Sequence, residues 1–144
     1  MQEDPLEVFV RNVARRAVGN AAGISKRLDR VLGTMVTTLE VMPKRSGAAS
    51  IRISYDPNNP SQIFLSFGKA TRMETDSREE IEELMAAIFS GRFKETVYRR
   101  GGKVARYASI VDLPGGPVRF YGGTLRALAL GPRQKEEIHH QPYE

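Results

Sequence analysis

The chain has 144 residues, 40% of them hydrophobic, and its 22 lysines and arginines outnumber 17 acids, for a formal net charge of +5 at pH 7. This length suits one domain, expected over residues 1–144, that buries about 70% of the surface its unfolded chain exposes. The chain has no cysteine and only two histidines, the adjacent His139 and His140. Thiol nucleophiles, thiolate metal sites, disulfides and well-spaced histidine ligands are therefore excluded.

We expect a cytoplasmic protein that does not enter a membrane. No apolar run approaches the about 20 residues that cross a bilayer. Residues 1–5 are acidic and lack the basic and apolar regions of a signal peptide.

The first predicted element is a helix that opens at residues 4–7, where Asp4 suits the N-cap, Pro5 the first turn and Glu7 the capping box. A second helical stretch is expected over residues 24–32, because its apolar residues fall on one helical face. Residues 34–42 fit two structures. Apolar spacing would continue one helix almost to Pro43, whereas several β-branched residues favour a strand over residues 35–42, which we adopt.

The middle of the chain predicts a hairpin and then a helix. Residues 51–55 and 63–67 alternate between apolar and polar side chains, and the turn-forming residues 56–60 separate them. Ser77 and Glu80 form a capping-box pattern before an apolar stripe at helical spacing, and Gly91 suits the C-terminal cap. We therefore expect an amphipathic helix over residues 77–90.

Three strands are expected next, over residues 93–100, 103–111 and 118–121, with a two-residue turn at Gly101-Gly102. Residues 132–144 are interpreted as a tail or an edge strand. The predicted class is α+β, with one or more N-terminal helical segments followed by a mainly antiparallel sheet of about five or six strands that the helix over 77–90 interrupts.

Charge is segregated along the chain. Residues 74–83 hold six acids and one base, whereas residues 92–135 hold ten bases and two acids. The acids fit the solvated first turns of a helix. Neighbouring histidines point apart in a helix or a strand, so His139 and His140 do not suggest a shared metal ion. We expect no metal, no cofactor and no catalytic residue. An enzyme built on Asp56, Asp112, Tyr107 or Tyr121 is a weaker alternative.

The hairpin over residues 93–111 carries the candidate binding site. The two-residue turn predicts that Tyr98 pairs with Ala105 and Val97 with Arg106, and alternation then sorts the side chains onto two faces. One face is predicted to point to the core and to contain Phe93, Val97, Val104, Ala108 and Ile110. The other combines cations with two tyrosines, and its predicted binding residues are Lys94, Tyr98, Arg100, Lys103 and Tyr107.

Such a face fits a non-enzymatic module that binds an acidic protein by steric and electrostatic complementarity. A regulatory protein is one possibility, and a toxin-neutralising protein is another. The chain shares size, segregated charge and missing catalytic groups with small α+β immunity and antitoxin proteins, although no motif links it to them. The alternative is a nucleic-acid-binding protein that uses the same hairpin, with cations on phosphates and tyrosines stacked on bases. The cationic face of the predicted hairpin could also be a solvated surface without a binding role, or the N-terminal helices could cover it.

Overall fold

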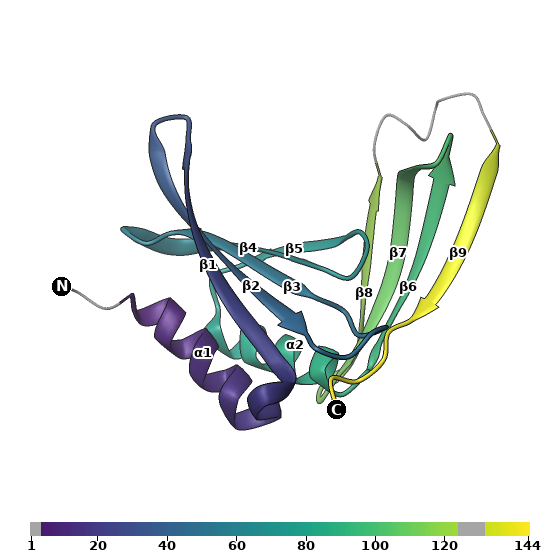
Figure 1. Cartoon of the computed structure of the whole chain (residues 1–144). Helices are drawn as coiled ribbons and strands as arrows, with labels where there is room; N and C mark the ends of the chain where they lie inside the picture. Colours follow the sequence, from purple (N-terminus) through teal and green to yellow (C-terminus); the bar gives the residue numbers. More distant parts are fainter. Residues whose placement is uncertain (1–3, 124–131) are drawn as a thin grey trace.

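The computed structural model describes residues 4–123 and 132–144, which form an α+β fold with two antiparallel sheets (Figure 1). The first part comprises α1 (Pro5–Val18), the short 3-10 helix η1 (Gly19–Ala21), β1 (Ala22–Val31), β2 (Thr34–Pro43), β3 (Ile51–Asp56), β4 (Asn59–Phe67) and β5 (Thr71–Thr75). The second part comprises α2 (Arg78–Phe89), β6 (Phe93–Arg100), β7 (Lys103–Leu113), β8 (Gly116–Gly123) and β9 (Arg133–His139). None of the described helices is long and apolar enough to span a membrane.

The strands divide between a five-stranded sheet, in the order β1-β2-β3-β4-β5, and a four-stranded sheet, in the order β8-β7-β6-β9. Helices α1 and α2 lie together against one face of the five-stranded sheet, and the four-stranded sheet stands beside it (Figure 1). The predicted α+β class and antiparallel pairing are confirmed. The prediction of one sheet of five or six strands is wrong, because the chain after α2 begins a second sheet and does not rejoin the first.

The core lies between the helices and the five-stranded sheet. Alternate residues of β3 and β4 point to the helices, so Ile51, Ile53 and Leu65 are buried. They pack with one face of each helix, including Val10 of α1 and Leu84 of α2. Each such side chain contributes about 1.5–3 kcal/mol when it leaves water, so this layer supplies most of the hydrophobic stabilisation.

Both helices begin where the sequence predicts. Asp4 accepts backbone N–H groups from the first turn of α1, and it also accepts the hydroxyl of Tyr55 from β3. At α2, the Ser77 hydroxyl accepts the Glu80 N–H at 3.2 Å. The Glu80 carboxylate does not close the capping box, since it accepts the Thr75 hydroxyl at 2.7 Å. Each cap therefore also attaches its helix to the preceding or facing strand.

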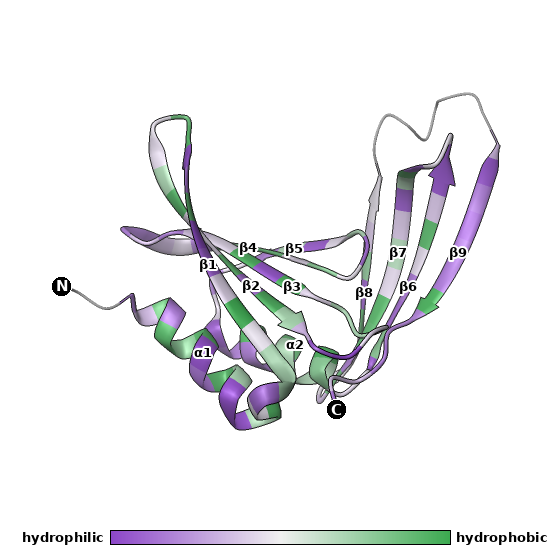
Figure 2. Ribbon diagram, viewed as in Figure 1, coloured by the Kyte–Doolittle hydropathy of each residue, from purple (hydrophilic) through white to green (hydrophobic). Residues whose placement is uncertain are grey.

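The strand predicted over residues 35–42 is confirmed as β2, but the helix predicted over residues 24–32 is wrong. Those residues form β1, which pairs with β2 along its whole length. Leu32 and Gly33, both with positive φ, make the tight turn between them. Because β1 pairs with β2 along its whole length, the backbone N–H and C=O groups of every second residue of β1 are hydrogen-bonded. This pairing outweighs the helical spacing of the apolar residues in β1. The β1–β2 hairpin projects beyond the helices and has a hydrophobic tip (Figure 2).

The last residues are part of the fold and not a tail. The edge-strand interpretation is confirmed by β9, whose polar residues leave it mostly hydrophilic (Figure 2). The chain then turns inward, and Tyr143 is 2% exposed. Its ring packs edge-on against Phe89 with centroids 4.7 Å apart, and its hydroxyl donates to the Ala49 carbonyl. The C-terminal segment thus attaches the four-stranded sheet to the core.

Candidate functional site

The two faces of the four-stranded sheet differ because residues of β6 alternate in direction. Phe93, Glu95 and Val97 are buried on the inner face, which packs toward the five-stranded sheet. The ring of Phe67 in β4 packs edge-on against this face, and its centroid lies 5.1 Å from that of Phe93 and 5.7 Å from that of Phe120 in β8. Lys94 and Tyr98 point the opposite way, onto a face that we call the outer face.

The strand register defines the outer face as five rows of directly opposite residues. At the end near Gly101 the rows are Arg133–Arg100–Lys103 and Lys135–Tyr98–Arg106. Toward the other end they are Glu137–Thr96–Ala108–Tyr121, His139–Lys94–Ile110–Arg119 and Asp112–Pro117. Among these described residues, seven lysines and arginines accompany two carboxylates, Glu137 and Asp112. The outer face is therefore strongly basic.

Four of the five predicted binding residues share this face, and Tyr107 does not. A β-bulge adds one residue to β7 between the pairs Tyr98–Arg106 and Arg99–Val104, so the predicted pairing of Tyr98 with Ala105 is wrong. An extra residue reverses the alternation of everything after it. Tyr107 consequently lies on the inner face, where its hydroxyl accepts the Arg72 N–H at 3.2 Å. Ala108 and Ile110, predicted for the core, lie on the outer face.

The same bulge brings Arg106, which the prediction placed opposite Val97, onto the outer face beside Tyr98. Its guanidinium carbon lies 4.2 Å from the centre of the Tyr98 ring. Such a cation–π contact restricts both side chains and leaves the N–H groups of the guanidinium available. Arg106 is a site residue that alternation alone could not identify.

Other outer-face residues were missed because their strands were poorly predicted. Tyr121 of β8 is 70% exposed, and Arg119 is its neighbour along the same strand face. Arg133 and Lys135 belong to β9, which the sequence indicated only as a possible edge. The available sequence signal was the alternation after Gly116. Arg119 and Tyr121 are two residues apart in that strand and therefore share a face.

Three hollows border the outer face among the described residues, and one of them, of about 440 Å³ beside Lys94 and Arg119, includes Asp112 in its lining. The other two lie among the rows of cations. The first, of about 350 Å³, lies at the Gly101 end, and its lining includes Arg99, Arg100, Arg106, Arg133, Lys135 and Tyr98. No carboxylate is among the described residues that line it. The second, of about 510 Å³, is lined in the middle of the face by Thr96, Ala108 and Ile110, and also by Lys94, Arg119, Tyr121 and the carboxylate of Glu137. A largely apolar middle with cationic and aromatic neighbours suits a binding surface for an acidic partner.

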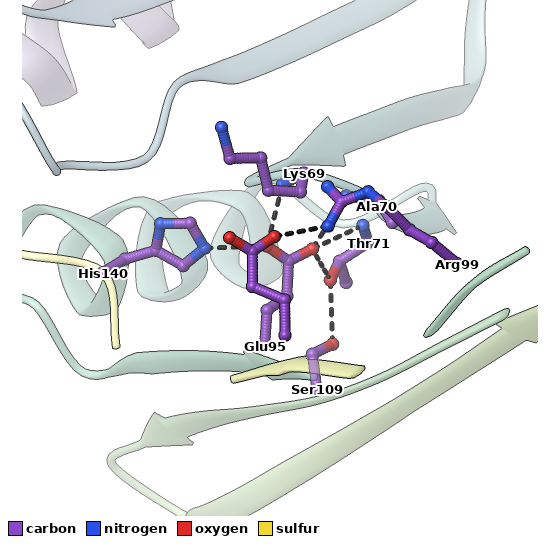
Figure 3. Close-up of polar contacts among 8 residues, drawn as sticks. Lys69, Ala70, Thr71, Glu95, Arg99, Ser109 and His140 are labelled. Atoms are coloured by element: carbon purple, nitrogen blue, oxygen red, sulfur yellow. Dashed lines mark hydrogen bonds and ion pairs between the residues drawn. The ribbon is translucent and has the colours of Figure 1, made fainter. Parts of the chain in front are cut away.

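A buried polar cluster holds the inner face to the five-stranded sheet (Figure 3). Glu95 is 1% exposed, and its carboxylate accepts the backbone N–H groups of Lys69, Ala70 and Thr71 at 2.7–3.0 Å. The Thr71 hydroxyl also reaches Glu95, at 2.8 Å, and it lies 2.9 Å from the Ser109 hydroxyl. One buried side chain thus joins β6 to the turn between β4 and β5.

His140 completes this cluster from the C-terminal segment. It is 4% exposed, its Nε2 lies 2.7 Å from a Glu95 oxygen, and its ring stacks on Phe93. The interpretation of both histidines as parts of a tail is therefore wrong for His140. His139 points elsewhere, with its Nε2 3.3 Å from the Gly91 carbonyl. Adjacent positions on an extended chain face apart, as expected.

Ionisation of Glu95 reflects two opposed effects. Burial alone raises the pKa of Glu95, because a charged carboxylate loses its water. Hydrogen bonds from His140, the Lys69 N–H, Thr71 and the Ala70 N–H outweigh burial, so the pKa lies below its ordinary value of 4.5. Glu95 is therefore a carboxylate at neutral pH.

Burial argues that this cluster is structural. Thr71, Glu95, Ser109 and His140 are each at most 4% exposed, so a substrate could not reach their polar atoms in this conformation. The alternative catalytic set does not converge either, because Tyr107 and Tyr121 lie on opposite faces of the four-stranded sheet. Within residues 4–123 and 132–144, no three histidines or acids gather as a metal site would require.

No family model matches this chain, and no curated protein or solved structure is significantly similar to it.

Proposed function

We propose that this protein is a non-enzymatic binding module whose outer face engages the acidic surface of a partner protein. The observation that carries the proposal is the composition of that face. Its described residues combine seven cations with two carboxylates, and two tyrosines share the sheet surface with them. Tyrosine and arginine are the residue types that most often supply binding energy at protein interfaces.

Support for a protein partner comes from the middle of the face. Thr96, Ala108 and Ile110 form a small, partly buried patch between charged ends. An interface of ordinary size has such an apolar centre and a polar rim. Long-range attraction between the cations and an acidic partner would raise the association rate, and the rate would fall with salt.

This mode of action requires only coverage of the partner. A protein that blocks a toxin or a regulated enzyme needs a rigid, complementary surface, and the Glu95 cluster and Tyr143 hold the four-stranded sheet rigidly to the core. Toxin neutralisation or regulation in the cytoplasm is the role we propose for this surface.

Charge reversal on the face tests the proposal. Affinity capture from cells that express the protein natively would compare three baits: the parent chain, the double variant Lys94→Glu/Arg119→Glu, and the control Arg30→Glu/Lys44→Glu. The control reverses two exposed bases outside the four-stranded sheet. We expect one acidic protein to be retained by the parent and the control and lost by Lys94→Glu/Arg119→Glu. Equal retention by all three baits would contradict the proposal.

A nucleic-acid partner is the second candidate, and the positions of Tyr98 and Tyr121 favour it. Both rings lie on the outer face among cations, an arrangement that could stack unpaired bases while the cations contact phosphates. Binding to random single- and double-stranded oligonucleotides over a salt series distinguishes the candidates. Affinity that falls steeply with salt supports nucleic acid, and no binding at low salt eliminates it.

A further inference from the structure

Like charges face one another directly at the Gly101 end of the outer face. Arg100 lies between Arg133 of β9 and Lys103 of β7 in one cross-strand row. Lys135 and Arg106 flank Tyr98 in the next row. Directly opposite like charges destabilise an antiparallel sheet. A bound anion would reduce this repulsion.

Only part of this positive charge is neutralised within the protein. Arg99 forms an ion pair with Glu136, and Lys135 lies 3.2 Å from Glu137. Glu136 and Glu137 are exposed, where such pairs are weak and easily exchanged for another anion. Arg106 and Arg133 form no ion pair with an acid among the described residues.

We propose that the hollow of about 350 Å³ at this end binds a phosphate group that carries close to two negative charges. We call it the phosphate pocket and define it by Tyr98, Arg100, Arg106, Arg133 and Lys135, because the side chain of Arg99 points to the inner face, where it pairs with Glu136. This inference rests on the proposed function, because it names the anion that the basic face would take from its partner. The volume is at the small end of ligand pockets, as a compact anion requires.

The kind of cation favours phosphate over a carboxylate. Three of the four bases are arginines, whose planar N–H forks bind two oxygens at once. One carboxylate offers two oxygens and one charge and is satisfied by a single fork. A phosphate monoester offers three terminal oxygens and about −1.5 to −2 charges at pH 7, so it can use several forks together.

The spacing of the bases favours a monoester over a nucleic-acid backbone. The two rows are separated by two residues along β6 and β9, or about 7 Å, and neighbouring strands lie about 5 Å apart. Four cations therefore surround a region the size of one phosphate group. A phosphodiester carries one charge, and its neighbours along a strand would extend beyond the pocket.

Tyr98 prepares the pocket for binding. The Arg106 guanidinium is already stacked on the Tyr98 ring at 4.2 Å. A side chain held in this way loses less conformational freedom when it binds an anion. The bulge in β7 places Arg106 there, so a local irregularity of the sheet builds the pocket.

Calorimetric titration with inorganic phosphate tests the proposal, with acetate as the carboxylate probe. The variants are Arg106→Gln and Arg133→Gln, and the matched control is Arg30→Gln, which removes an exposed arginine of β1. We expect phosphate to bind more tightly than acetate and each pocket variant to weaken phosphate about tenfold, as loss of a charged hydrogen bond does. The control should keep the affinity of the parent chain. Circular dichroism confirms that each variant is folded. Equal loss in all three variants, or no preference over acetate, would overturn the proposal.

A second titration distinguishes the source of the phosphate. It compares an acidic peptide that contains one phosphoserine with the same peptide unphosphorylated. A gain that Arg133→Gln removes identifies a phosphorylated side chain, and tight binding of inorganic phosphate without such a gain identifies a free phosphate. An oligonucleotide that displaces phosphate as well as the phosphopeptide does would contradict the preference for a monoester. The titrations could show no phosphate binding while the Lys94→Glu/Arg119→Glu variant still fails to capture the partner. That result would contradict the phosphate pocket and leave the proposed binding face supported.

Discussion

The two faces of the four-stranded sheet use charge in opposite ways. On the inner face Glu95 is buried, and every oxygen of its carboxylate has hydrogen-bond partners from the five-stranded sheet or the C-terminal segment. On the outer face Arg100 lies opposite two other cations in an exposed row. Charge on the inner face therefore holds the molecule together, whereas the outer face places like charges directly opposite one another. The comparison indicates which residues should change stability and which should change binding.

The largest expected effect is that of Glu95→Ala. The variant leaves three backbone N–H groups, the Thr71 hydroxyl and His140 without their acceptor in a buried site. Removal of one member of a buried charged network destabilises by about 3–5 kcal/mol. Urea unfolding would measure the loss. The control Glu137→Ala removes an outer-face carboxylate and should change the free energy of unfolding by less than about 0.5 kcal/mol. Similar losses in both variants would contradict the contrast between the faces.

The pH dependence of stability follows from the same carboxylate. The pKa of Glu95 is lower in the folded protein than its ordinary value of 4.5, so ionised Glu95 stabilises the fold above that value. This contribution decreases as the pH falls below 4.5 through the lowered pKa. Between pH 5 and pH 2, the free energy of unfolding of Glu95→Gln should therefore decrease less than that of the parent chain. Parallel stability curves for the two proteins would show that Glu95 does not act in this way.

A smaller effect is expected from Tyr143→Phe, which retains the ring packing on Phe89 and removes the hydroxyl that donates to Ala49. Loss of a buried hydrogen bond of this kind destabilises by about 1 kcal/mol. The matched change Tyr121→Phe, on the outer face, should have almost no effect on thermal unfolding. The opposite ranking would show that the C-terminal segment is not anchored by its tyrosine.

The smallest effect, and one of opposite sign, is expected from Arg133→Gln. Removal of a cation directly opposite Arg100 relieves repulsion, so the free energy of unfolding should rise slightly, within about 0.5 kcal/mol. High salt screens such repulsion, and the difference from the parent chain should then disappear. A variant that loses stability at low salt would mean that Arg133 supports the fold.

Local patterns predicted much of the fold. Capping residues gave the starts of both helices, and alternation gave β3, β4 and most of β6. The helical spacing of residues 24–32 was misleading, because pairing with β2 is a tertiary effect that spacing does not report. β5 was missed because it has five residues, with charged Arg72 and Glu74 on its exposed side.

The binding face was predicted in part, for physical reasons. Lys94, Tyr98, Arg100 and Lys103 were placed correctly together, since they lie on β6 or beside the turn. The β-bulge in β7 puts Tyr107 on the inner face and Arg106 on the outer face. The alternation of residue types in the sequence does not reveal this bulge. The role of His140 was not predictable, because its partner Glu95 is 45 residues away and lies in another strand.

The central claim is that the outer face of the four-stranded sheet is the binding surface. Amide chemical-shift mapping during titration with a polyglutamate peptide tests it most directly. We predict shifts centred on Lys94, Tyr98, Arg106 and Tyr121 that grow with peptide concentration and weaken with salt, with β3 and β4 unaffected. Shifts centred on α1 or on the β1–β2 hairpin, with the outer face unchanged, would contradict the account.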